Sequence, residues 1–200
     1  MFGKLFSFLL LLTSITTCQS TLSDSYRLDV NITSTPTPWT STIQFPQFNR
    51  TNNTLLAVYT FITSTLSSQT NATNVLPPLA NGYLYTSFNI DLSVNGTSLI
   101  DLYAVVNSPS YQLYQYQSKV DSSPIIKTVT KGVTMSSSPS LLNMFIGNTT
   151  TNVDVSATSQ LWTVATESIN PPSNGGNVIA SYVTPPTASL YSITVKYYYN

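Results

Sequence analysis

The strongest constraint on the fold is a two-residue alternation of apolar and polar side chains, clearest at the end of the chain in SLYSITVKYYYN. Side chains of a β-strand point alternately to its two faces, so this period is typical of a strand with one buried face. The apolar face is expected to pack in a core, and its members are Tyr191, Ile193, Val195, Tyr197 and Tyr199. Similar runs recur along the chain, and no apolar period of 3.6 residues persists. The pattern predicts an all-β fold.

Turn-forming residues divide these runs into about nine to eleven short strands. The segment 55–66, in TLLAVYTFITSTL, contains neither Gly nor Pro and is predicted to be a central strand. At most one short helix is expected, near residues 141–145. Thr, Val, Ile, Tyr and Phe are abundant, and they suit a pleated, half-buried surface. Many short strands separated by turns predict an antiparallel β-sandwich or a jelly-roll-like fold.

The dipeptide Asn95-Gly96 predicts a β-hairpin, because both residues accept the positive φ angles of a two-residue turn. With a regular ladder beyond that turn, Leu92 is expected opposite Leu99.

The first twenty residues are typical of a secretory signal peptide. Lys4 supplies the positive start, and the apolar run 5–12 is too short to span a bilayer. Cleavage is predicted after Cys18 or after Ser20, which makes the protein secreted and extracellular with no transmembrane anchor. As an alternative, Cys18 follows the apolar run where a lipidated cysteine would lie.

The remaining residues, 21–200, are predicted to form a single β-sandwich domain, a length that can bury a core of its own. Within it, residues 21–43 are predicted to be a first strand followed by a Pro-containing loop around Pro36 and Pro38.

Charge is sparse, with seven basic and seven acidic residues and a net charge of zero. A neutral chain has no basic stripe for phosphates, so nucleic acid is not an expected partner. Exposed sheet edges are normally protected by charged residues, and this chain has few. Self-association through sheet edges is therefore predicted, besides binding to components of an extracellular matrix or wall.

Three segments resemble the choice-of-anchor E domain, a family of exported β proteins. They are FPQFNRTNNTLLAVYTFITSTLSSQTNAT, FIGNTTTNVDVSATSQ and LYSITVKYYYN, and they are distributed from Phe45 to Asn200, across most of the chain after the signal peptide. Asn53 departs from the pattern, because the family usually has Gly there. The resemblance implies an extracellular sandwich without an established activity. Family members carry differing C-terminal anchors, and none is expected here.

No catalytic or cofactor motif is present, and an enzyme is not expected. The chain contains no His and a single Cys, which excludes a histidine-based triad or metal site. Asp91 and Asp101 flank the hairpin, but a regular register places them on opposite sides of the sheet. A long-range pair such as Asp154 with Glu167 is the alternative that would suit a glycoside hydrolase. RLDVN and KVDSS hold one acid each, which predicts turn caps and not calcium ligands.

Six asparagines carry the acceptor pattern for N-glycosylation, a number that the composition alone would produce. Those in loop-like stretches, Asn49, Asn52 and Asn71, are the preferred candidates. The full set is Asn31, Asn49, Asn52, Asn71, Asn95 and Asn148.

Aromatic residues suggest a sugar-binding surface. In YQLYQYQ, read as a strand, Tyr114 and Tyr116 share one face and could stack on a sugar. The favoured interpretation is that they are inner or cross-strand residues of the sheet. Trp39 is expected to be exposed after Pro38, whereas Trp162 in QLWTV is expected in the core. The leading prediction is a non-enzymatic β-sandwich with a structural or adhesive role in an extracellular coat, wall or matrix. The alternative is a carbohydrate-binding module that uses exposed aromatics to bind glycans.

Overall fold

The computed structural model of the chain describes residues 22–28, 32–49, 53–75, 79–135, 138–167 and 178–200. Within these ranges the protein is an antiparallel β-sandwich of eleven strands in two sheets, with one short helix, α1 (Pro139–Asn143). Sheet A contains β1 (Leu22–Leu28), β2 (Ile32–Pro36), β4 (Leu55–Asn74), β8 (Ser118–Val120), β9 (Ile125–Met135) and β11 (Val178–Tyr199). Sheet B contains β3 (Trp39–Pro46), β5 (Ala80–Val94), β6 (Thr97–Asn107), β7 (Tyr111–Leu113) and β10 (Thr150–Glu167). The predicted all-β sandwich is confirmed.

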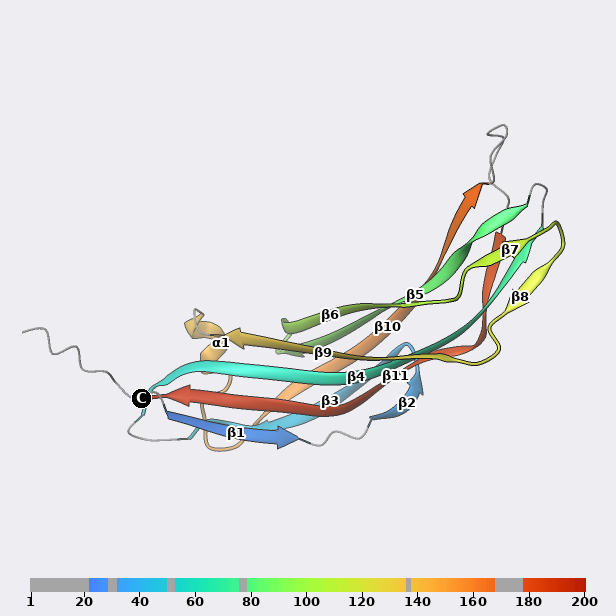
Figure 1. Ribbon diagram of the computed structural model, residues 1–200. Coiled ribbons are helices and arrows are strands. Elements are labelled where there is room, and N and C mark those ends of the chain that lie inside the picture. The colour runs from blue at the N-terminus through green and yellow to red at the C-terminus, as the bar shows by residue number, and fades with distance from the viewer. Residues whose placement is uncertain (1–21, 29–31, 50–52, 76–78, 136–137, 168–177) are drawn as a thin grey trace, which may run out of the picture.

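Each sheet is built around two long antiparallel strands. In sheet A, β4 and β11 form the centre, with β1 and β2 beside β11 and with β8 and β9 beside β4. In sheet B, β10 and β5 form the centre, with β3 beside β10 and with β6 and β7 beside β5. Figure 1 shows the long strands running the length of the molecule and bending together toward the end that carries β7 and β8.

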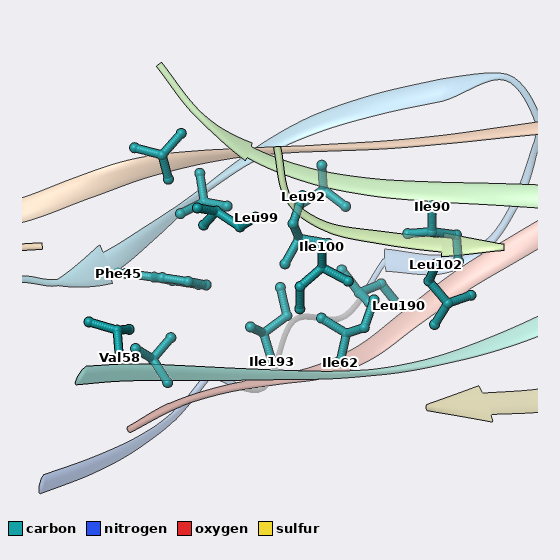
Figure 2. Close-up of a cluster of buried hydrophobic side chains, with 14 of the residues drawn as sticks. Phe45, Val58, Ile62, Ile90, Leu92, Leu99, Ile100, Leu102, Leu190 and Ile193 are labelled. Carbon is teal, nitrogen blue, oxygen red and sulfur yellow. The ribbon is translucent and has the colours of Figure 1, made fainter. Parts of the chain in front are cut away.

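The alternation of apolar side chains builds the core between the sheets. Side chains from sheet B such as Ile90 and Leu92 point toward Ile62 and Ile193 of sheet A, as Figure 2 shows. All four are fully buried. Burying each such aliphatic side chain contributes about 1.5–3 kcal/mol, so this main core dominates the stability of the sandwich.

A second, smaller apolar cluster lies beyond the main core, toward the end with β7. Its buried members are Ala72, Ala80, Leu84, Tyr111 and Leu113. Between the two clusters, Ser68 and Thr86 meet across the interior with their hydroxyl oxygens 2.6 Å apart. This polar pair separates the two apolar clusters. Because the two buried hydroxyl groups bond to each other, neither is left without a hydrogen-bond partner.

The Asn95-Gly96 hairpin forms as predicted, but its register changes after two pairs. Both turn residues have positive φ, 49° and 75°. A β-bulge then makes Leu99 an extra residue, so that Leu92 lies opposite Ile100 and not opposite Leu99. The prediction for Leu92 is therefore wrong, because a bulge places two residues against one and reverses the parity of everything beyond it.

The same bulge corrects the expectation for the two acids beside the hairpin. Asp91 lies directly opposite Asp101 in the ladder of β5 and β6. Directly opposed residues of an antiparallel pair point to the same face of the sheet, so the two carboxylates are neighbours and are not separated by the sheet.

Strand β11 continues through two consecutive prolines. Pro185 and Pro186 lie between Thr184 and Thr187, where the pairing with β4 shifts register, and a bulge tolerates their missing N–H groups. A further shift after Leu190 exposes Tyr191. The prediction that Tyr191 belongs to the core is wrong, whereas the other members of that predicted face, Ile193, Val195, Tyr197 and Tyr199, are buried.

The segment 21–43 differs from its prediction as well. Strands β1, β2 and the beginning of β3 occupy it, with only Thr37 and Pro38 between β2 and β3. The predicted signal peptide and Cys18 lie outside the described residues.

Candidate functional site: the outer face of sheet B

The outer face of sheet B carries aromatic and amide side chains in neighbouring cross-strand rows. Tyr103, Asn89 and Thr158 form one row across β6, β5 and β10. Two residues earlier in β5, Val105, Ser87 and Gln160 form the next row, followed by Asn107, Tyr85 and Trp162. We call this surface the platform, and it comprises Tyr83, Tyr85, Ser87, Asn89, Tyr103, Thr158, Gln160 and Trp162.

Trp162 is the best-fixed aromatic residue of the platform. Its ring stacks on Tyr85, with 6.1 Å between ring centroids and 13° between ring planes. The indole N–H donates to Ser87 Oγ at 2.9 Å. The side chain nevertheless remains 43% exposed. An exposed indole that is held by a stacking contact and by a hydrogen bond loses little freedom when a ligand stacks on it.

An open depression of ≈ 490 Å³ lies beside Trp162. Tyr103, which is 65% exposed, also lines it. The amides of Asn89 and Gln160 and the carboxylate of Asp101 provide polar groups around these rings. Flat aromatic rings with amides and a carboxylate beside them can stack on the C–H face of a sugar and hydrogen-bond its hydroxyls.

The carboxylates of this face are held by neighbouring hydroxyls. Ser98 Oγ donates to Asp91 Oδ1 at 2.5 Å, and Thr42 Oγ1 donates to Asp154 Oδ1 at 2.7 Å. Within the described ranges, no three His, Cys, Asp or Glu side chains gather closely enough to hold a metal ion. The opposed pair Asp91 and Asp101 has the residue types of a glycosidase site, but Asp101 is exposed on an open face that does not exclude water.

The three aromatics expected from the sequence lie elsewhere. Tyr114 and Tyr116 are 63% and 76% exposed, but they lie in the turn between β7 and β8 and not on a strand. Trp39 is in β3, at the opposite edge of sheet B from β7. Its ring packs against the main core, and its indole N–H donates to the carbonyl of Ala188 at 3.2 Å. The expectation of an exposed Trp39 is therefore wrong, and the structure does not bring the three residues together.

Sequence reasoning placed Trp162 in the core and gave no role to Tyr85 or Tyr103. The alternation of inner and outer positions along β10 is the sequence signal that places Trp162 on the outer face. Val153, Val155 and Ala157 are buried, so the even-numbered residues that alternate with them, Trp162 included, point to the outer face.

The predicted glycosylation sites fall into different surroundings. Asn49, Asn95 and Asn148 are exposed, the first and last in loops and Asn95 in the hairpin turn. Asn71 lies within β4, paired on both sides by β8 and β11, so the expectation that it occupies a loop is wrong. Asn31 and Asn52 lie outside the described residues.

Of the two acids considered for calcium, Asp121 is buried and bonds to the neighbouring strand β4, so it is not the local turn cap that was predicted. Its Oδ2 accepts hydrogen bonds from the backbone N–H of Thr70 at 2.9 Å and from Thr70 Oγ1 at 2.7 Å. Asp29 lies outside the described residues.

No protein-family model matches the chain, and no curated protein matches it in sequence. The resemblance to the choice-of-anchor E domain therefore stays a prediction. Among solved structures, the chain is similar to a chain of the infectious bursal disease virus Gx strain, with 12% identity and a TM-score of 0.18. A chain of the Gt strain gives 13% identity and a TM-score of 0.15. Each match covers 89% of this chain but only 42% and 41% of the viral chains. Among the described residues, no helix is long and apolar enough to cross a membrane.

Proposed function

We propose that the protein is a secreted, non-enzymatic adhesive module that binds glycans of an extracellular wall or matrix on the platform. The observation that carries this proposal is the Trp162–Tyr85 stack, exposed beside a depression that is lined by amides. A buried stack would be core packing, whereas an exposed and hydrogen-bonded one offers a flat ring to a ligand.

The platform suits sugars better than it suits a protein partner. Its aromatic rings have polar groups beside them, so a ligand must offer both C–H faces and hydroxyl groups. A pyranose ring has both. The aromatic run of Tyr83, Tyr85 and Trp162 is bordered by polar side chains at both ends, so the platform is a narrow aromatic run and not the broad apolar patch that drives protein association. The bordering residues are Asn81 at one end and Ser87, Asn89 and Gln160 at the other.

The proposal is tested by measuring the binding of the purified protein to a panel of immobilised polysaccharides. Trp162→Ala is expected to weaken binding about tenfold or more, which corresponds to about 1.4 kcal/mol and is within reach of one aromatic contact. Tyr116→Ala removes a more exposed aromatic from the turn outside the platform and is expected to bind like the parent. Binding lost in Tyr116→Ala but kept in Trp162→Ala would assign the site to the turn instead.

A hydrolase acting on the bound glycan is the competing function, and the Asp91–Asp101 pair is its one specific support. The release of reducing ends from each bound polysaccharide distinguishes the two. We expect none, because the pair lies on an open face. Turnover that disappears in Asp101→Asn, while binding persists, would replace the adhesive function by a catalytic one.

A structural role in the same extracellular layer is supported by the edges of the sandwich. Strand β3 ends sheet B, and β1 and β2 end sheet A, so their outer hydrogen-bonding groups face away from their own sheets. Light scattering after size-exclusion chromatography at micromolar concentration tests self-association, and a strict monomer contradicts it. An intact mass of the secreted protein tests export, the cleavage site after Cys18 or Ser20, lipid on Cys18 and the number of glycans.

A further inference from the structure

A second open depression lies on the same face as the platform, near the end of the sandwich that carries β7. It measures ≈ 570 Å³, and its lining includes Asn81, Tyr83, Gln112 and Val164. Asn81 and Gln112 are paired residues of β5 and β7, just as Asn89 and Tyr103 are paired in β5 and β6 at the first depression. Both depressions therefore offer aromatic and amide groups.

The aromatic rings of the platform connect the two depressions. Tyr85 stacks on Trp162 at the first depression, and its ring centroid lies 6.4 Å from that of Tyr83, which lines the second. Residues 81, 83, 85, 87 and 89 share one face of β5, because side chains alternate along a strand. At about 3.3 Å per residue, the distance from Asn81 to Asn89 is about 26 Å. That length is several sugar rings laid end to end, and it is too long for a single terminal sugar.

The charge of the face restricts the ligand further. Three acidic residues in the strands of sheet B, Asp91, Asp101 and Asp154, lie at positions that point to this face, and these strands contain no Lys or Arg. A polysaccharide that carries carboxylate or sulfate groups would bring like charges together, and the only ammonium groups that the described residues bring to this sheet, those of Lys127 and Lys131, bond to carbonyls at its β6 edge. An uncharged chain avoids this repulsion and can still donate its hydroxyl groups to the carboxylates.

We propose that the platform binds the interior of an uncharged, linear polysaccharide that lies along β5 and occupies both depressions. This inference depends on the proposed glycan-binding function and adds the length, the direction and the charge class of the ligand. Trp162 and Tyr85 hold the middle of the chain, and the amides at Asn89 and Asn81 lie at its two ends.

The test is calorimetric titration of the full secreted protein with neutral linear gluco- and manno-oligosaccharides of increasing length. Affinity is expected to rise by about tenfold or more between a disaccharide and the chain that first reaches both depressions. Tyr83→Ala and Gln112→Ala are expected to remove that rise, and Gln112→Ala, which lies outside the platform, is expected to leave disaccharide affinity unchanged. Tyr103→Ala, at the first depression, is expected to weaken short and long ligands alike. Both Tyr83 and Gln112 are exposed, and circular dichroism of each variant confirms that it folds.

The outcomes separate the inference from the function on which it depends. Two results would overturn the proposal of an extended, uncharged ligand and leave glycan binding intact. One is equal affinity for short and long oligosaccharides. The other is a preference for an acidic polysaccharide, such as polygalacturonate, over a neutral one. Absence of binding to every oligosaccharide and to every immobilised polysaccharide would overturn both. Association of the protein with itself that is abolished by Trp162→Ala would also overturn the inference, because the platform would then be a contact between copies.

Discussion

Tyr111 and Tyr197 are both buried tyrosines, but their hydroxyl groups have opposite surroundings. Tyr197 donates to the carbonyl of Pro46 at 2.5 Å. The Tyr111 hydroxyl is enclosed in the second apolar cluster, and no described residue offers it a hydrogen bond. Burial raises the pKa of Tyr111 above its usual value, because the ionised form would have to leave water.

Tyr111→Phe is therefore expected to increase the free energy of unfolding by about 1 kcal/mol, because it removes a buried polar group that has no partner. Tyr197→Phe is the matched control and is expected to lower it by about 1–2 kcal/mol, because it leaves the Pro46 carbonyl unsatisfied. Urea unfolding at neutral pH measures both. Equal effects of the two substitutions would contradict the different roles assigned to these hydroxyls.

The raised pKa of Tyr111 also predicts the direction of a pH effect. The unfolded state loses the tyrosine proton near the ordinary tyrosine pKa of 10.0, whereas the folded state keeps it to higher pH. The folded state then binds more protons, so the contribution of this residue is complete below that pH and is lost as the pH rises above it. Urea midpoints measured above pH 10 are expected to fall less steeply for Tyr111→Phe than for the parent protein. Parallel slopes would contradict a burial effect at this site.

At the scale of the elements, the two sheets meet along β6 and β9. Lys127 and Lys131 of β9 extend their ammonium groups to the backbone carbonyls of Val105 and Asp101 on β6. Since β6 is an edge strand, these carbonyls would otherwise be open to a strand of another molecule. The sequence suggested that the chain has too few charged residues to protect its sheet edges, but Lys127 and Lys131 lie where they cover the β6 edge.

Replacing both lysines by Ala is expected to increase self-association, because it uncovers the β6 carbonyls while the fold loses only about 1 kcal/mol or less per exposed contact. Lys196→Ala is the matched control, since Lys196 lies 5.0 Å from the ring centroid of Tyr198 and away from β6. Light scattering over a concentration series would show a larger mean mass for the double variant than for the control. Identical masses would mean that the lysines do not protect this edge.

The elements also show how far sequence reasoning reaches. The alternation predicted the sandwich and the Asn95-Gly96 turn, since both depend on local chemistry. The bulge in the hairpin escaped it, because no residue near the turn marks it. In β11 the two prolines mark the register shift, but they do not show that the strand continues beyond it. The missed register put Asp101 on the wrong face. The platform was missed for a different reason. A Trp in an apolar run is usually a core residue, and only the alternation along the long strand β10 shows that Trp162 points to the outer face.

At the scale of the whole molecule, the charges are divided between the two sheets. Every Lys and Arg of the described residues lies in a strand of sheet A, at Arg27, Lys119, Lys127, Lys131 and Lys196. The strands of sheet A contain only one acid, Asp24, whereas those of sheet B contain four acids and no base. A net charge of zero therefore conceals two layers of opposite sign.

At low ionic strength and pH 7, the protein is expected to be retained by both cation and anion exchangers despite its zero net charge, because screening then extends over about 30 Å, comparable to the size of the domain. Lys196→Ala should elute earlier from the cation exchanger, and Asp101→Asn should elute earlier from the anion exchanger. Elution without delay from both columns would show that the charges are too evenly spread to act as two layers.

The division of charge gives the molecule a preferred orientation. On an anionic support it would settle with sheet A downward, which turns Trp162 and its neighbouring rings away from that support and toward whatever lies opposite. A sandwich oriented in this way links two surfaces by different forces. The electrostatic attraction between sheet A and the support weakens as the salt concentration rises, because salt screens the charges. Stacking on a neutral sugar persists, so salt would detach the molecule from the support and not from the sugar.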